Sequence, residues 1–224
     1  YCFDPDRIEK LIGKFTEKSR LTDIVADVQK TPEEARVTAM RRVTDGIARI
    51  KAIDPDLHDV FNFAIHTLFY HRSNESSGGS VSSSPGVIWC GPRTNWSDDD
   101  MAEFLVHELA HNMLFIDERR YQHYIDFDEI AKPENYAISA VLNKPRPLDK
   151  VLHSLVVAHE LLSFREAMGD KEGHGRVAHP ETKRLFSSYL DSLESVRDLL
   201  ARKDLVSDRA KEIVESLSRS PTVQ

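Results

Sequence analysis

Apolar residues recur at intervals of three and four through the first third of the chain, which is the period of an amphipathic helix. The pattern predicts helices over residues 4–30, 31–54 and 56–70. Thr31 and Pro32, followed by two glutamates, are typical of a helix start, because a capping side chain, an early proline and acids near the positive dipole end all favour it. The first third is therefore predicted to be helical.

The helical period stops at RSNESSGGSVSSSPG, residues 72–86, which is almost wholly polar, glycine or proline. Such a composition predicts a flexible loop without regular structure, mobile in the absence of substrate. The apolar run VIWCG, residues 87–91, follows it. This run is short and rich in residues that favour strands, so it predicts a β-strand.

A second helical region begins at Ser97, which can cap a helix whose first turn carries three aspartates. Residues 117–147 show no period, and prolines near their end exclude a helix there. The period returns over residues 148–168 and 181–217, with a loop between them. The pattern as a whole predicts a mostly α-helical fold with a small β element (α+β).

This organisation predicts a single domain over residues 1–224. Its parts would be a helical N-terminal part (1–72), the flexible loop (72–86) and a region that holds a metal site (87–168). In that region, the helix that carries the histidine motif described below is expected to pack against a second helix that carries site residues.

Composition excludes some classes of partner. The net charge of -7 and the lack of a basic run argue against binding to nucleic acid or to an acidic membrane surface. No apolar stretch approaches the roughly 20 residues of a membrane helix, so a cytoplasmic protein is expected. The two cysteines, Cys2 and Cys90, are expected to be free thiols. Because the sequence starts at Tyr1 rather than methionine, we expect residues to precede it in the native protein.

The stretch FLVHELAHNMLFID, residues 104–117, contains the motif HExxH inside the predicted helix. His107 and His111 are four apart, so their imidazoles project from one face, about 5–6 Å apart at Cβ. That spacing lets both rings hold one divalent transition-metal ion, with Glu108 beside them. The alternative is a helix that carries two histidines and no metal.

A catalytic metal site normally needs a third protein ligand and an open position. The extended metzincin motif would have glycine at 114 and histidine at 117, whereas this chain has Leu114 and Asp117. Asp117 could still bind the metal if the chain turned there. Glu160 on the helix over residues 148–168 is a second candidate, as in gluzincins.

His153 is the candidate that we favour as third ligand, because Arg146 precedes it by seven residues and is held between two prolines. Two histidines and one further ligand on one face of an octahedron form the iron(II) site of non-heme oxygenases. A nearby guanidinium fork would receive the carboxylate of a 2-oxo acid. The alternatives are a half-buried His153 with no metal and an Arg146 that pairs with Asp149.

Two segments of the chain, LVHELAHNMLF and KPRPLDKVLHSLVVAHEL, resemble the bacterial HExxH-motif peptide-modification family, which are 2-oxoglutarate- and iron-dependent peptide β-hydroxylases. The resemblance covers roughly residues 87–168. It implies a metal held by His107, His111 and His153, Arg146 at a carboxylate of 2-oxoglutarate, and a ribosomally made precursor peptide as substrate. The sequence NYAISAVLNK, before the RPL segment, departs from the family pattern.

Two functions of different classes follow as alternatives. In the oxygenase, Glu108 would orient a histidine or a bound water. In a zinc metallopeptidase of the zincin type, Glu108 would be the general base that takes a proton from metal-bound water. A helical binding module with a structural metal site is the third hypothesis, and it predicts no turnover.

Overall fold

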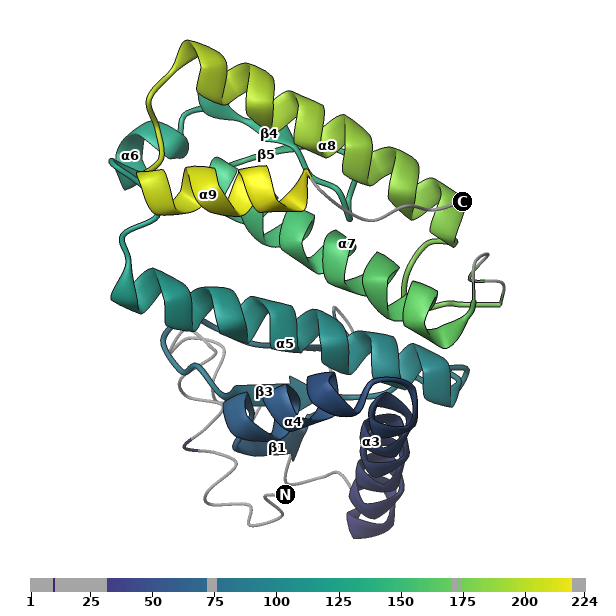
Figure 1. Ribbon diagram of the computed structural model, residues 1–224. Helices are drawn as coiled ribbons and strands as arrows, with labels where there is room; N and C mark the ends of the chain where they lie inside the picture. The colour runs from purple at the N-terminus through teal and green to yellow at the C-terminus, as the bar shows by residue number, and fades with distance from the viewer. Residues whose placement is uncertain (1–9, 11–31, 72–75, 171–172, 174, 219–224) are drawn as a thin grey trace. The chain divides into compact units, whose positions relative to one another are not determined.

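The computed structural model describes residue 10 and residues 32–71, 76–170, 173 and 175–218. The chain divides into two compact units, Tyr1–Phe115 and Ile116–Gln224. Helices make up most of the described chain and the strands are short (Figure 1). The predicted class, mostly α-helical with a small β element, is confirmed. The described helices include none that is both long and apolar enough to cross a membrane.

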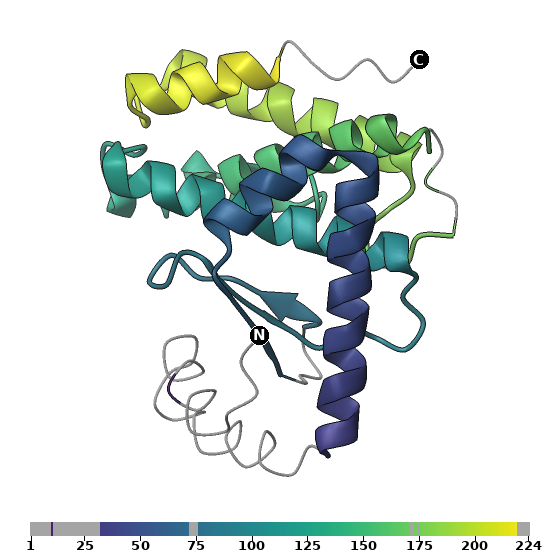
Figure 2. The ribbon, with the colours of Figure 1, turned by 60° about the horizontal axis from the view of Figure 1, so that its bottom comes forward.

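The first unit combines helices with one small sheet. In the sheet, the central strand β3 pairs in parallel with β1 and antiparallel with β2. The two leading helices, α3 and α4, meet at a sharp turn (Figure 2). The elements are α3 (Glu33–Ile53), α4 (Pro55–Ala64), β1 (Thr67–Tyr70), β2 (Gly78–Gly79), β3 (Val87–Cys90) and α5 (Asp98–Arg120), which continues into the second unit.

The third predicted helix, over residues 56–70, is too long. Asp54 caps α4 by accepting a hydrogen bond from the Leu57 amide at 2.9 Å, but the helix ends at Ala64. The following residues, which are rich in β-branched and aromatic side chains, form β1, because the backbone of β3 offers them parallel partners. The predicted helix over residues 4–30 lies outside the described residues, apart from Lys10.

The glycine and serine segment contains a regular element that its composition did not predict. Gly78 and Gly79 form β2 and pair with Cys90 and Trp89. A Cβ atom at position 78 would lie 2.2 Å from the ring of Phe104 and 2.8 Å from the carbonyl oxygen of Trp89. Only glycine therefore allows this strand to approach α5 so closely.

We expect Gly78→Ala to destabilise the protein by about 1–3 kcal/mol, the usual range for overpacking a filled site. Urea unfolding monitored by circular dichroism measures the change. Gly79→Ala is the matched control, because a Cβ there comes no closer than 3.0 Å to a side-chain atom of Trp89. Equal losses of stability in both variants would contradict the steric explanation.

The second unit is built on three helices, and α7 packs against both α8 and α9 (Figure 1). Two very short strands, β4 and β5, pair antiparallel before α7 begins. The elements are α6 (Phe127–Ile130), a 3₁₀ turn (Pro133–Asn135), β4 (Ala137–Ile138), β5 (Pro145–Arg146), α7 (Leu148–Met168), α8 (Thr182–Arg202) and α9 (Asp208–Leu217).

The predicted helix over residues 148–168 is confirmed as α7, and its end is marked by Gly169 in the left-handed conformation. The predicted helix over residues 181–217 is two helices instead of one. Between them, Leu205 and Val206 are buried, and Ser207 caps α9 by accepting from the Ala210 amide. The chain leaves the helical path after Arg202 so that this apolar pair is buried. The cap at Ser207 then starts α9.

Candidate metal centre

The helix that carries HExxH starts as the sequence predicts. The Ser97 hydroxyl oxygen accepts a hydrogen bond from the Asp100 amide at 3.0 Å, and Asp100 accepts from the Ser97 amide at 2.9 Å. These reciprocal bonds satisfy two backbone donors at the helix start. α5 then runs without a break past the motif to Arg120.

The two motif histidines face one another in the first unit. Their Nε2 atoms are 3.1 Å apart, and both rings are half-buried. Phe115 stacks on the His111 ring with an interplanar angle of 14°. Two nitrogens that bind the same ion at roughly 2.0–2.1 Å each lie about 3 Å from one another. The pair therefore has the separation that two imidazole ligands of one metal require.

Glu108 is buried on the side of α5 that faces the sheet. Its carboxylate accepts a hydrogen bond of 2.7 Å from the Ser80 hydroxyl. Burial raises the pKa of Glu108 to about 7, although the bond from Ser80 opposes the rise. Cys90 is a free and buried thiol, as predicted, and its pKa rises to about 12 through burial and the nearby charge of Glu108. Cys2 lies outside the described residues.

Asn112 connects the motif helix to the loop before β3. Its side-chain oxygen accepts from the Gly86 amide at 2.6 Å, and its side-chain nitrogen donates to the Glu108 carbonyl at 2.7 Å. Sequence reasoning missed both Asn112 and Ser80. Asn112 follows Glu108 by four residues on an otherwise apolar helix face, which was a usable signal. Ser80 is one serine among many in its segment, and nothing local marks it.

His153 and Arg146 belong to the second unit. His153 is buried on α7, and its Nε2 atom lies 3.1 Å from a carboxylate oxygen of Glu118. Arg146 is half-buried, and its backbone in β5 is paired with Ala137. Within the described chain its guanidinium has no ion pair, and Asp149 contacts Lys150 at 3.0 Å instead.

The two other candidate ligands have other partners. Arg209 holds Asp117 with two hydrogen bonds of 2.9 and 3.0 Å, and His123 contacts it at 2.6 Å. Partial burial opposes the charge of Asp117, but Arg209 and His123 outweigh it and lower its pKa. Glu160 is half-buried on α7. The pKa of Tyr189 is raised by burial first, and the charge of Glu160 raises it further. Asp117 is thus already held by two side chains, and both acids lie in the second unit.

No group of three or more His, Cys, Asp or Glu side chains arranged for a metal occurs among the residues that the structure describes. His107 and His111 are brought together within the first unit, whereas His153 lies in the second. The pairing of the motif histidines is therefore a structural observation. The three-histidine ligand set stays a prediction, and so does the packing of the two helices that carry it.

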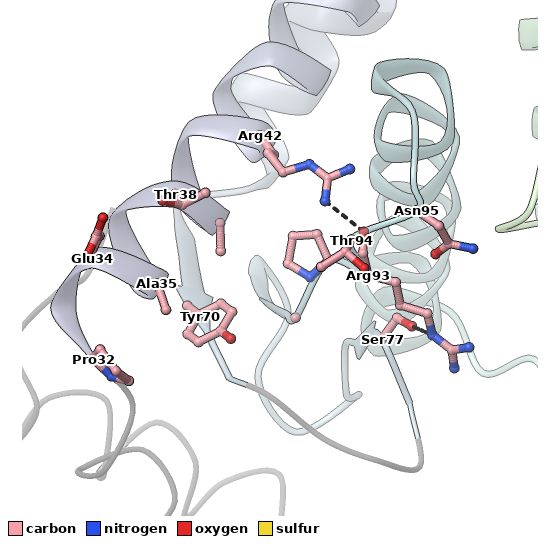
Figure 3. A pocket seen from close by; sticks show the side chains of 13 residues that line it. Pro32, Glu34, Ala35, Thr38, Arg42, Tyr70, Ser77, Arg93, Thr94 and Asn95 are labelled. Carbon is pink, nitrogen blue, oxygen red and sulfur yellow. Dashed lines mark hydrogen bonds between the residues drawn. The ribbon is translucent and has the colours of Figure 1, made fainter.

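A separate pocket of about 860 Å³ lies in the first unit between α3 and the loop after β3 (Figure 3). Arg42 reaches across it and donates to the backbone carbonyl of Arg93 at 2.7 Å, while Arg93 donates to the Ser77 hydroxyl at 2.8 Å. None of the residues that the sequence predicted for the metal site lines this pocket.

Comparisons with known proteins do not identify a family for this chain. No protein-family model matches the sequence, and no curated protein matches it either.

Proposed function

We propose that the protein is an iron(II)- and 2-oxoglutarate-dependent oxygenase that hydroxylates a peptide side chain at its β carbon. The observation that carries the proposal is the 3.1 Å separation of the His107 and His111 Nε2 atoms. His153 would supply the third ligand. This assignment is supported by the sequence resemblance and by the suitability of three imidazoles for iron(II).

Arg146 would bind a carboxylate of 2-oxoglutarate. Pro145 and Pro147 restrict the backbone on either side, and the pairing of β5 with β4 fixes it further. When bound, iron(II) and 2-oxoglutarate would supply the oxidation of the peptide C–H bond by dioxygen, with succinate and carbon dioxide as co-products. The chain's part is to hold and orient these groups.

Glu108 would have a positioning role in this oxygenase. Its carboxylate accepts from Ser80, so it holds the motif helix against the segment before β3, as Asn112 does through Gly86. The two histidines on the neighbouring turns would keep their orientation through this attachment.

The zinc metallopeptidase is the second candidate, and the raised pKa of Glu108 favours it. A carboxylate with a pKa of about 7 suits a general base at neutral pH. If Glu108 were that base, Glu108→Gln would lower peptide cleavage by roughly 10²- to 10⁴-fold while metal stayed bound. In the oxygenase the same variant would impair turnover, measured as succinate formation, without abolishing it.

Anaerobic reconstitution with iron(II), followed by 2-oxoglutarate, tests the proposed function directly. A weak visible charge-transfer band and succinate formation on exposure to air are the expected results. The zinc-loaded protein, treated in the same way, is the control and should give neither. Peptide cleavage by the zinc form, with no band from the iron form, would establish the peptidase and overturn the oxygenase.

We expect Arg146→Lys to weaken binding of 2-oxoglutarate by about 1.5–3 kcal/mol, or roughly 10- to 100-fold, because an ammonium cannot replace the planar fork. Metal content and melting temperature should stay nearly unchanged. Titration of 2-oxoglutarate into the anaerobic iron form measures the loss. Arg184→Lys, an exposed arginine on α8, is the matched control. Unchanged affinity in Arg146→Lys would remove Arg146 from the site.

A further inference from the structure

Glu118 lies among three partners inside the second unit. One of its carboxylate oxygens is 3.1 Å from His153 Nε2 and 3.7 Å from His123 Nδ1. The hydroxyl of Tyr124 is buried nearby, and its pKa rises well above the usual value through burial first and the charge of Glu118 second. Glu118 is thus a partly buried carboxylate, with 21% of its side chain exposed.

His123 holds the residue that precedes Glu118 on α5. Its imidazole is fully buried, and its Nε2 atom lies 2.6 Å from Asp117. Asp117 is itself held by Arg209 of α9 through two hydrogen bonds. Arg209 and His123 therefore both hold Asp117, and this restrains the last turn of α5, from which the neighbouring Glu118 projects.

We infer that Glu118 is the positioning residue for His153: it accepts the Nε2 proton of His153 and so fixes both the tautomer and the ring orientation of this ligand. The inference rests on the proposed function, in which His153 binds the metal. In a neutral imidazole, a proton on Nε2 leaves the lone pair on Nδ1, so Nδ1 is the nitrogen that would bind the ion.

The physical reason is general for metal sites. A carboxylate that accepts a hydrogen bond from a ligating histidine orients the ring and increases its basicity, and its loss typically costs 10- to 100-fold in metal affinity. Glu118 is suited to this role because Arg209 and His123 hold the preceding residue, Asp117, and so restrain the turn that carries Glu118. The contact between Glu118 and His153 also predicts which tautomer His153 has in the metal-free protein. A change in this tautomer reports on positioning, because no catalysis takes place without the metal.

The test uses the full chain with Glu118→Ala, which removes the acceptor, and Glu118→Gln, which keeps an acceptor oxygen without the charge. Long-range ¹H–¹⁵N spectra of the metal-free protein at about pH 8.5, where histidines are generally neutral, report which ring nitrogen of His153 carries the proton. The unmodified chain and Glu118→Gln should show the proton on Nε2. Glu118→Ala should show a mixture of the two tautomers.

Metal affinity is the second measurement. Anaerobic titration with iron(II) should give 10- to 100-fold weaker binding for Glu118→Ala and a smaller loss for Glu118→Gln. Glu166→Ala, an exposed glutamate on α7, is the matched control and should bind as the unmodified chain does. His153→Ala is titrated in parallel to test the ligand itself, and melting curves confirm that each variant is folded.

The outcomes separate this inference from the proposed function. If His153→Ala loses metal but Glu118→Ala changes neither tautomer nor affinity, the ligand stands and the positioning role is wrong. If Glu118→Ala weakens binding while His153→Ala does not, Glu118 acts on the metal in another way, and the inference is again wrong. If neither variant affects metal binding, the three-histidine site fails as well.

Discussion

Replacing His107 or His111 with alanine is expected to abolish stoichiometric metal binding while the protein stays folded. The Nε2 atoms of these rings face one another at 3.1 Å, so both should bind the same ion, and removing either one leaves a site with too few ligands. Both rings are half-buried, and the α5 backbone does not depend on them. The loss should therefore appear in metal content rather than in helicity.

Elemental analysis of the purified variants, after loading with iron(II) under anaerobic conditions, measures the effect. His58→Ala is the matched control, because His58 is a histidine of the same unit that contacts Asp59 and Asn62. We expect about one metal per chain in the control and close to none in the two motif variants. Full occupancy in either motif variant would show that the histidine pair does not bind metal.

Glu108→Gln is expected to stabilise the metal-free protein at alkaline pH and to leave its stability nearly unchanged in acid. Burial raises the pKa of Glu108 from 4.5 to about 7, so the folded protein holds this proton more tightly than the unfolded chain. The free energy of unfolding must then fall as the pH rises from about 4.5 to about 7, and level off above that. A shift of this size corresponds to roughly 3 kcal/mol.

Glutamine has nearly the same shape, cannot ionise, and can still accept the hydrogen bond from Ser80. Urea unfolding with a chelator present, at about pH 4.5 and about pH 8, gives the comparison. We expect the variant to gain up to about 3 kcal/mol at the higher pH and little at the lower. Asp59→Asn, which changes an exposed carboxylate of the same unit, is the control and should show no such difference. A variant that is equally destabilised at both values would contradict a raised pKa.

Local patterns were sufficient for several elements. The capped start of α5, the strand β3 and the whole of α7 were predicted, because caps, apolar runs and helical periodicity are properties of neighbouring residues. β1 was not predicted, since four residues become a parallel strand only when β3 lies beside them. β2 was missed for the same reason: it depends on two glycines that pass close to Phe104.

In the candidate site, too, local features were predicted from the sequence and contacts between distant residues were not. The spacing of His107 and His111 is local to one helix, so the sequence revealed that they would meet. The contacts of Ser80 with Glu108, and of Glu118 with His153, join residues 28 and 35 positions apart. Such contacts are decided by tertiary packing. The sequence around a serine or a glutamate does not indicate which distant residue it will contact.

The ion pair between Asp117 and Arg209 joins the beginning of the second unit to the start of its last helix. The two residues are 92 positions apart in the sequence, so this contact closes a long loop of chain. Closing a long loop costs conformational entropy before the contact can form, and contacts between residues so distant in sequence slow folding. The second unit should therefore acquire this ion pair late in folding, after the chain between the two residues has become compact.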